Sequence, residues 1–185
     1  MKTGLGLVLL LCLSGSAFGS NDLPRFYEVL KDKVYRGGQP TDQGIETLAK
    51  GGIRTVLDLR IEDEDRIESE GRLVQNLGMN FISVPLHAVF KPKDRDMNYI
   101  ESILVDPKFQ PVFIHCEQGQ DRTGLAIGLF RVFYQHEDPN EAYREMLTYG
   151  FHKILIALKH YFQERTGLRT FELEETRNAI IQLSP

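Results

Sequence analysis

The sequence predicts an α/β fold with a mostly parallel central sheet of four to five strands and helices on both faces. The main observation is an alternation: short apolar segments typical of strands are each followed by a longer segment with helical spacing of apolar residues. A second observation is the segment 53–59, which has Thr55-Val56-Leu57 at its centre and is typical of a buried strand. Strands that alternate with helices need crossover connections, and such connections produce parallel strands.

The first part of the chain supplies one strand and one helix. Residues 21–30 are of mixed character, and we expect their apolar side chains to cover an edge of the sheet. Val34-Tyr35-Arg36 is a short strand, and the glycines and proline of 37–40 form a turn. Thr41 is then expected to cap a helix that Gly51-Gly52 ends.

The middle of the chain repeats this pattern twice. After the strand at 53–59, the acidic run Glu62–Glu70 begins a helix that continues to Gly78. We interpret this run as a solvated helix face, because no histidine cluster accompanies it as a metal site would require. Residues 80–84 form the third strand, and Asp94 is placed to cap a helix that Pro107 ends.

The last part of the chain is mostly helical. Residues 112–115 form the fourth strand, and an apolar helix occupies 124–134. Asp138-Pro139-Asn140 begins another helix, and a final one covers 154–162. The stretch 166–185 is weakly patterned and predicts no function.

Length and charge exclude several classes of protein. A chain of 185 residues is expected to form a single domain, here residues 20–185. The formal net charge is −4, and no cluster of Lys and Arg is dense enough to bind nucleic acid.

The N-terminus resembles a secretory signal peptide covering residues 1–19. Lys2 precedes an apolar run from Leu5 to Leu13, and the small residues Ala17 and Gly19 match the two cleavage-site positions. The apolar run is too short for a membrane anchor. We therefore expect an exported protein, periplasmic or secreted, in which Cys116 is the only cysteine left after cleavage near Gly19.

The chemistry is expected at residues 111–123, where a strand, a short loop and the start of a helix follow one another. Cys116 is the first loop residue and Arg122 lies six positions later. A loop that ends at a helix N-terminus directs backbone N–H groups toward one point, and the helix dipole adds positive character there. Such a site holds a tetrahedral oxyanion, and the planar fork of Arg122 matches two of its oxygens.

In this setting Cys116 is expected to lie beneath the anion as a thiolate nucleophile. A lone cysteine after an apolar run is more often a small buried hydrophobe. The combination of His115, Cys116, Gly119, Arg122 and Thr123 with an apolar helix favours the nucleophile. Thr123 is expected to donate its hydroxyl to the sulfur, which would make the sulfur a better leaving group.

The pattern His115-Cys116-x5-Arg122-Thr123 resembles the signature of the cysteine-dependent protein tyrosine phosphatase superfamily. The resemblance extends loosely over residues 34–162, where V-Y-R-G-G-Q-P-T and G-I-R-T-V-L-D-L-R are similar to the compact dual-specificity branch. It implies a protein-tyrosine-phosphatase-like fold and a phosphocysteine intermediate. Neither a metal nor an organic cofactor is expected, because the thiolate and the arginine supply the charge stabilisation.

The expected contacts to substrate come from the loop and from cations beyond it. Cys116 and Arg122 are the expected catalytic groups, with Asp121 beside them. Arg60 lies at the carboxyl end of a strand, where ligands bind in open α/β sheets, although an ion pair with the acidic run behind it is an equal alternative. His115 is expected to fix the loop from behind. The full set of expected substrate-binding residues is Glu117, Gln118, Gly119, Gln120, Asp121, Arg122, Arg60, Lys91 and Lys93.

The general acid is an open question. The superfamily usually supplies it from an aspartate about 30 residues upstream, but that neighbourhood reads V-P-L-H-A-V-F-K-P and contains none. Asp121 is one candidate, since C-x2-G-x-D-R resembles the loop of the myotubularin inositol-lipid phosphatases, and bracing of the loop is its alternative role. Asp94, Asp96 and His87 are the other candidates, and for Asp94 the helix cap is the stronger interpretation.

The expected substrate is a phosphorylated small molecule or a phosphoprotein. Export favours inositol polyphosphate (phytate), because the tyrosine-phosphatase-like phytases are exported and need a basic mouth, to which His152 and Lys153 would also contribute. A dual-specificity or tyrosine protein phosphatase is the alternative. A catalytically inactive phosphate-binding module is the third hypothesis, from a different class.

Overall fold

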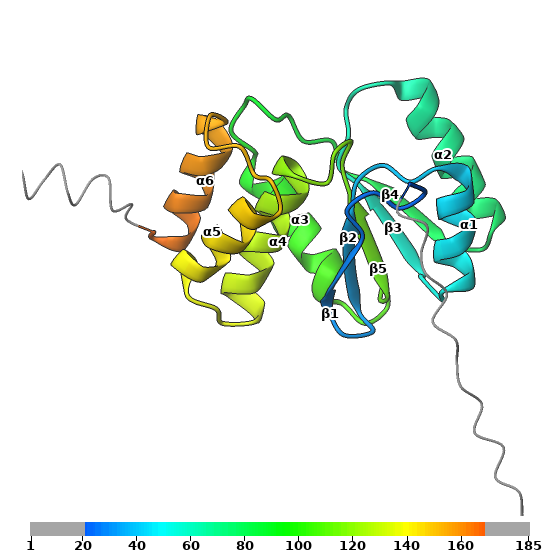
Figure 1. Cartoon of the computed structure of the whole chain (residues 1–185), viewed down its shortest axis with the longest axis horizontal. Helices are drawn as coiled ribbons and strands as arrows, with labels where there is room; N and C mark the ends of the chain where they lie inside the picture. Colours follow the sequence, from blue (N-terminus) through cyan, green and yellow to red (C-terminus); the bar gives the residue numbers. More distant parts are fainter. Residues whose placement is uncertain (1–20, 169–185) are drawn as a thin grey trace, which may run out of the picture.

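A five-stranded sheet runs through the middle of the computed structural model, which describes residues 21–168 (Figure 1). The strand order is β1-β2-β5-β3-β4, and every neighbouring pair is parallel except β1 with β2. The expected signal peptide and the stretch 169–185 lie outside the described residues. The strands are β1 (Tyr27–Leu30), β2 (Val34–Gly37), β3 (Thr55–Asp58), β4 (Asn80–Ser83) and β5 (Val112–His115).

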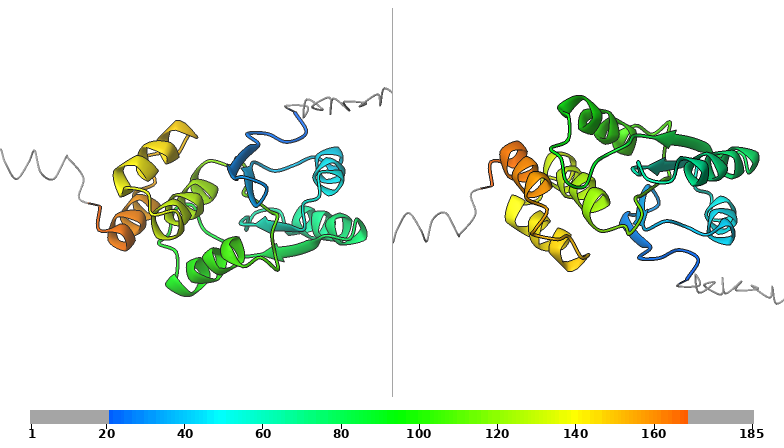
Figure 2. Two further views of the ribbon diagram at one scale, coloured as in Figure 1. Left: turned by 90° about the horizontal axis from the view of Figure 1, so that it is seen from below. Right: turned by 90° about the horizontal axis from the view of Figure 1, so that it is seen from above.

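Helices cover both faces of this sheet, as the sequence predicts (Figure 2). One face carries α1 and α2, and the other carries α3 and α4, with α5 and α6 packed outside α4. The helices are α1 (Asp42–Lys50), α2 (Glu64–Asn76), α3 (Asp94–Val105), α4 (Asp121–Tyr134), α5 (Pro139–Thr148) and α6 (Ile156–Thr166).

The alternation of side chains along the central strand β5 explains the two cores. Val112 and Ile114 belong to the core under α3 and α4, whereas Phe113 belongs to the core under α1 and α2. Successive side chains of a strand point to opposite faces, so a central strand must be apolar on both. All three of these side chains are fully buried.

The N-terminal edge of the sheet differs from the simple alternation of strands and helices. We expected residues 21–30 only to cover an edge, but Tyr27–Leu30 form the strand β1, which pairs antiparallel with β2. Only the short turn before Val34 separates the two strands, and a tight connection of this kind can only join antiparallel neighbours.

Of the two predicted helix caps, one is confirmed and one is wrong. Thr41 accepts a hydrogen bond from the backbone N–H of Gly44. At the predicted start of α5, Asp138 accepts a cap hydrogen bond from the backbone N–H of Asn140. Asp94 does not cap α3, because it is already the first helical residue. Its Oδ1 instead accepts a hydrogen bond at 2.9 Å from the hydroxyl of Tyr161 on α6, and burial together with this bond raises the pKa of Tyr161 to about 12.

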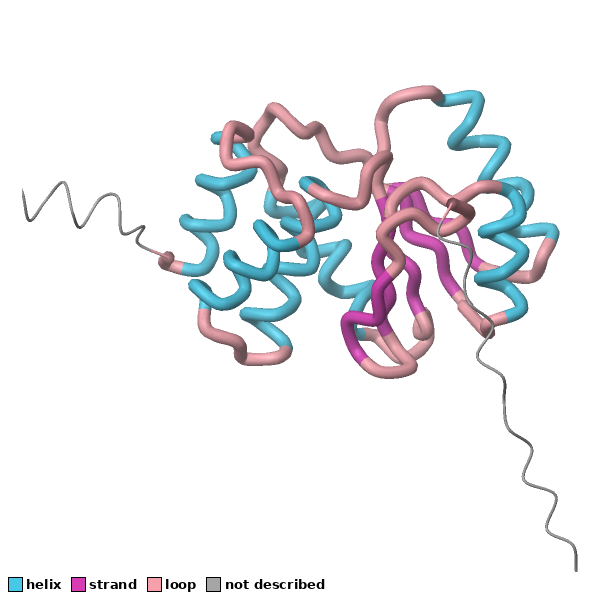
Figure 3. The backbone as a smooth tube through the Cα atoms, viewed as in Figure 1, coloured by secondary structure: helices cyan, strands magenta, loops and turns pink. Residues whose placement is uncertain are grey.

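The parallel strands end at one edge of the sheet, and the loops that follow them gather there (Figure 3). These are residues 59–63 after β3, 84–93 after β4 and 116–120 after β5. Open α/β sheets bind ligands at this edge. Within residues 21–168 no helix is long and apolar enough to cross a bilayer.

Candidate active site

A pocket of about 390 Å³ opens where β5 passes into α4. Cys116 directly follows the strand, and Asp121 and Arg122 form the first turn of the helix. The pocket brings together the loop, the segment after β3, the segment after β4 and the connection between α5 and α6. Its lining residues are Glu62, Ala88, Cys116, Glu117, Gln118, Asp121, Arg122, His152, Ile154 and Leu155.

The carbonyl groups of the loop are held on the side away from the pocket. The carbonyl of Glu117 accepts a hydrogen bond from the backbone N–H of Gln39, at 3.0 Å. The carbonyl of Gln118 accepts one from Arg25 at 3.4 Å, and that of Gly119 accepts one from the buried Arg36 at 2.9 Å. A trans peptide points its C=O and N–H in opposite directions, so the N–H groups of residues 118–120 face the pocket.

These N–H groups remain available to a ligand. Within the described part of the chain, the backbone N–H groups of residues 117–121 donate to no protein acceptor. They lie at the N-terminus of α4, whose dipole adds partial positive charge. Successive N–H groups in this arrangement bind anions, as the sequence predicts for this loop.

Gly119 allows the loop to approach the end of β2 closely. Its φ is +69°, a conformation that side chains disfavour, and a Cβ on this residue would lie 2.3 Å from the carbonyl oxygen of Gly37. The loop therefore rests directly on the backbone of Gly37 and Gly38. This contact positions the carbonyl of Gly119 for its hydrogen bond with Arg36.

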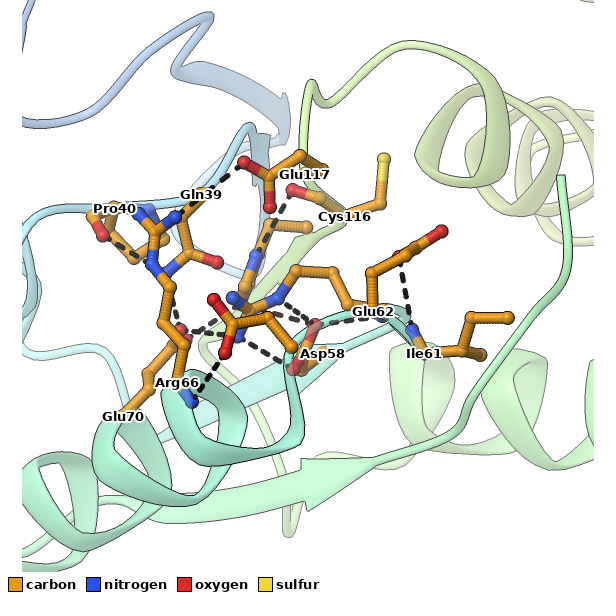
Figure 4. Close-up of polar contacts among 12 residues, drawn as sticks. Gln39, Pro40, Asp58, Ile61, Glu62, Arg66, Glu70, Cys116 and Glu117 are labelled. Carbon is orange, nitrogen blue, oxygen red and sulfur yellow. Dashed lines mark hydrogen bonds and ion pairs between the residues drawn. The ribbon is translucent and has the colours of Figure 1, made fainter.

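Cys116 lies between the apolar core and the pocket. The residue is 2 % exposed and contacts the core under α3 and α4, but it also lines the pocket beside Arg122. Figure 4 shows its sulfur pointing away from the buried carboxylates of Asp58 and Glu70. The sulfur is therefore on the side of the sheet edge where a ligand enters.

Arg122 closes one side of the pocket and is 7 % exposed. Its Nη1 donates to a carboxylate oxygen of Glu62 at 2.7 Å and, more weakly, to the carbonyl of Leu86 at 3.4 Å. Burial opposes ionisation of Glu62, but the hydrogen bond and charge of Arg122, together with hydrogen bonds from the backbone of Glu62 and Ile61, outweigh the burial and lower the pKa of Glu62. The guanidinium thus already binds an oxyanion on the pocket side, which is the property expected of a phosphate-binding arginine.

Asp121 contacts His152, which the sequence suggests only as one of several basic residues near the site. One oxygen of Asp121 accepts a hydrogen bond from the backbone N–H of His152 at 2.7 Å. The Nδ1 atom of the His152 ring lies 3.0 and 3.1 Å from the two oxygens of Asp121. Asp121 therefore connects the first turn of α4 to the segment between α5 and α6.

A buried cluster of polar side chains lies beneath the loop, on the face covered by α2 (Figure 4). The sheet register places Asp58 beside His115. Arg60 donates to both oxygens of Asp58 at 2.9 Å and to Glu70 at 2.6 Å. The Nε2 atom of His115 lies 2.9 Å from the other oxygen of Glu70, and Gln39 donates to Glu70 at 2.5 Å.

This cluster corrects the role expected for Arg60. The residue lies at the carboxyl end of β3, as predicted, but its side chain folds back onto Asp58 and is fully buried. It is therefore not a substrate contact. The alternative, an ion pair with the acidic run, is confirmed in Glu70, although the pair is buried rather than on the surface.

Glu70 also departs from the solvated helix face predicted for the acidic run. Its side chain is 3 % exposed, and it contacts Arg60, His115 and Gln39 at once. Burial opposes its ionisation, but these three partners outweigh the burial and lower the pKa of Glu70. His115 lies behind the loop at this cluster, as expected, and does not line the pocket.

Several other expected site residues lie elsewhere. Lys91 forms an ion pair with Glu164, and neither Lys91 nor Lys93 lines the pocket, because the segment after β4 turns toward α6. The side chain of Gln120 points away from the pocket, toward Gly150. The hydroxyl of Thr123 is buried and makes no hydrogen bond to the sulfur of Cys116.

The remaining acid candidates also lie outside the pocket. Asp94 bonds to Tyr161, and Asp96 pairs with Arg95 at 3.0 Å. His87 is exposed and meets the ring of Phe90 edge-on. Only Asp121 among the expected acids lines the pocket.

A larger hollow of about 640 Å³ lies along α2 and β4. Its lining includes Ile67, Gly71 and Phe81 but neither Cys116 nor Arg122. No group of three or more His, Cys, Asp or Glu side chains within residues 21–168 is placed to hold a metal ion. The pocket of about 390 Å³ is the candidate active site, because a thiol and a guanidinium line it beside the free N–H donors of the loop.

A family model described as the DSP-PTPase phosphatase fused to NAD+ kinase matches residues 23–164. The dual specificity protein phosphatase TpbA of Pseudomonas aeruginosa is 27% identical over 118 residues, which cover 64% of this chain and 51% of that protein. The inositol diphosphatase DSP5 of Arabidopsis thaliana is 29% identical over 114 residues, covering 58% of this chain and 54% of that protein. The chain thus spans about half the length of the curated relatives it matches.

A solved structure supports the fold. The core catalytic domain of the PP-IP phosphatase SIW14 from S. cerevisiae superposes with a TM-score of 0.64 at 20% sequence identity. The superposition covers 86% of this chain and 94% of that one. The predicted α/β architecture with a mostly parallel sheet is therefore confirmed both by the structure and by its neighbours.

The buried cluster predicts a large loss of stability when Glu70 is removed. In Glu70→Ala, the buried Arg60 and His115 lose a shared partner, and we expect the free energy of unfolding in urea to fall by about 3 kcal/mol. Glu68→Ala is the matched control on the same helix, because Glu68 is exposed and forms a surface ion pair with Arg72. Equal losses in the two variants would contradict the role given to the cluster.

The lowered pKa of Glu70 also predicts a pH dependence. A carboxyl group whose pKa is lowered by folding stabilises the protein above its unfolded pKa, about 4.3, and loses this contribution as the pH falls further. The stability difference between the wild type and Glu70→Ala should therefore be full at pH 6 and shrink below about pH 4. A difference that grows on acidification would contradict this assignment.

Proposed function

Since the chain belongs to the family described as the DSP-PTPase phosphatase fused to NAD+ kinase, we propose that it hydrolyses phosphomonoesters through a phosphocysteine intermediate. One observation carries the proposal. The thiol of Cys116 and the guanidinium of Arg122 line a single pocket, and the loop that joins them carries the free N–H groups of residues 118–120. A tetrahedral dianion is the ligand that satisfies all of these donors while placing its central atom above a nucleophile.

The proposed reaction begins when the phosphate takes the place of the Glu62 carboxylate at Arg122. Glu62 is suited to exchange because its side chain is 55 % exposed. The thiolate of Cys116 then attacks phosphorus, the bond from phosphorus to the ester oxygen breaks, and the loop N–H groups stabilise the charge on the equatorial oxygens. Water hydrolyses the phosphocysteine, and the thiolate leaves.

The proposal predicts the effects of substitutions at the two central residues. Cys116→Ser should lower kcat on an aryl phosphate by several orders of magnitude and still bind phosphate, because only the nucleophile is lost. Arg122→Lys should be nearly as damaging, since a lysine cannot form the planar fork.

The measurement for both variants is kcat by steady-state assay, together with phosphate affinity by calorimetry. The exposed Arg72→Lys serves as the control, and near wild-type turnover in Cys116→Ser would reject the mechanism.

The charges around the pocket bear on the substrate. Glu62, Glu117 and Asp121 are acidic, whereas Arg122 is the one lining residue that always carries a positive charge. The adjoining Ile154 is apolar and 82 % exposed. We propose that the substrate carries a single phosphate on an apolar or aryl group, as phosphotyrosine does.

Inositol polyphosphate (phytate) is the second candidate. It is supported by the inositol diphosphatase among the relatives and by the resemblance to phytases. The basic mouth it requires would have to come from residues outside the pocket lining, such as the exposed Lys153 and Lys93. We rank it lower, because three carboxylates beside the site repel a polyanion.

The two substrate classes are separated by comparing kcat/KM for a phosphotyrosine peptide and for inositol hexakisphosphate. We expect the peptide to be preferred by at least about tenfold, which is roughly 1.4 kcal/mol of discrimination against the polyanion. Preference for inositol hexakisphosphate would make the inositol substrate the better proposal. Binding of phosphate without turnover of either substrate would support the inactive phosphate-binding module.

We also propose that the chain is exported, on the strength of the N-terminal sequence alone. The apolar run 5–13 and the small residues at 17 and 19 support cleavage after Gly19. Mass spectrometry of the chain from a secretion-competent host should then find Ser20 as the first residue. A chain that keeps Met1–Gly19 in the cytoplasm would contradict export.

A further inference from the structure

The pair formed by Asp121 and His152 has the geometry of an oriented proton carrier. The Nδ1 atom of His152 lies 3.0 and 3.1 Å from the two carboxylate oxygens of Asp121. A carboxylate accepts hydrogen bonds, so this contact places the proton of the neutral ring on Nδ1. The second nitrogen, Nε2, is on the far side of the ring from Asp121, and it bonds to no residue of the described part of the chain.

The backbone around His152 holds the ring in this position. The N–H of His152 donates to Asp121 at 2.7 Å, so the residue is attached to the first turn of α4 by its backbone as well as by its ring. The preceding Phe151 is 4 % exposed and packs against Tyr143 and the α4 glycine Gly124. The N–H of Phe151 donates to the carbonyl of Met146, which ties the segment to the end of α5.

Gly150 makes this approach of the two segments sterically feasible. Its φ is +90°, and a Cβ there would lie 2.2 Å from the side-chain nitrogen of Gln120. The side chain of Gln120 thus occupies the space beside Gly150, immediately before the helix turn that carries Asp121. The segment that presents His152 is therefore packed against the catalytic loop itself.

His152 lines the same pocket as Cys116 and Arg122, and its side chain is 53 % exposed. It is the only histidine among the pocket-lining residues. The other ionisable groups at the pocket are Glu62, Glu117 and Asp121. In the absence of phosphate Glu62 pairs with Arg122, and Glu117 pairs with Arg66, so each carboxylate faces a cation there.

We propose that His152 is the general acid and base of the reaction, oriented by Asp121. The inference rests on the proposed function, and it answers the question that the missing upstream aspartate raises. Asp121 is less suited to donate a proton itself, because both of its oxygens face N–H donors. Asp94, Asp96 and His87 do not line the pocket.

In this proposal Nε2 of His152 transfers the proton both when the phosphocysteine forms and when water hydrolyses it. As the sulfur of Cys116 bonds to phosphorus and the ester oxygen leaves, Nε2 of the protonated His152 ring transfers its proton to that oxygen, and the product alcohol departs. The neutral ring then accepts a proton from water at Nε2 while the water oxygen bonds to phosphorus. The bond between phosphorus and sulfur breaks, and the thiolate and the protonated ring are restored.

The test uses His152→Asn, because the asparagine amide can keep the contact with Asp121 while the Nε2 atom is lost. The readout is kcat/KM for an aryl phosphate with a good leaving group and for an alkyl phosphate with a poor one. This constant reports only the steps up to and including the first irreversible step, which here is departure of the alcohol. We expect kcat/KM for the alkyl ester to fall by about 10²- to 10³-fold, and for the aryl ester by less than about tenfold. His160→Asn, an exposed histidine on α6 outside the pocket, should change neither value.

A second variant separates lost acid catalysis from a disturbed loop. In His152→Ala, added imidazole should restore turnover of the alkyl ester, and it should not restore turnover in Cys116→Ser. Equal losses on both esters, an unaffected alkyl ester, or absence of imidazole rescue would each overturn the assignment of His152. If the wild type itself turned over neither ester, the proposed function would fail and this inference with it.

Discussion

The site depends on the buried contact of Glu70 with Arg60 and His115. Arg60 follows β3, Glu70 belongs to α2 and His115 ends β5, so this contact joins three elements directly below the candidate nucleophile. Charges of this kind are costly to bury, and each must be paired where the solvent cannot reach it. The sheet register makes this pairing possible, because it places Asp58 beside His115. Arg60 can then bond to the carboxylates of Asp58 and Glu70.

Above this cluster, the outward direction of the loop carbonyls determines what the loop can bind. Gln39, Arg25 and Arg36 hold three successive carbonyls away from the pocket, so the N–H groups that follow them must face it. Because these donors find no protein acceptor within the described residues, an anion is the ligand that satisfies them. Arg122 adds a guanidinium at the same point, and the loop delivers the sulfur of Cys116 beneath it.

The sequence predicts the parts of this arrangement that depend on local pattern. The strands, the helices and the spacing from Cys116 to Arg122 are readable because their signals lie within a few consecutive residues. The sequence also places the carboxyl end of β3 correctly. It leaves substrate contact and an ion pair as equal alternatives for Arg60, because nothing local reveals that the side chain turns back onto Asp58.

The functional partners that the sequence did not reveal are all long-range. Glu62 reaches Arg122 across 60 positions, Arg36 reaches Gly119 across 83, and His152 reaches Asp121 across 31. A carboxylate or a histidine in a polar segment looks like a surface residue until the fold shows what faces it. For Lys91 the sequence predicts a functional contact that the structure does not show. Its position in the loop after β4 suggests a phosphate contact, but Lys91 forms an ion pair with Glu164 on α6.

The central claim is that the sulfur of Cys116 bonds to phosphorus within this pocket. It is tested most directly by rapid acid quench of the protein during turnover of an aryl phosphate, followed by mass spectrometry of its peptides. The account predicts a phosphate group on the peptide that contains Cys116, bound to sulfur and absent when the reaction is allowed to finish. Turnover with no phosphorylated peptide, or with the phosphate on another residue, would contradict it.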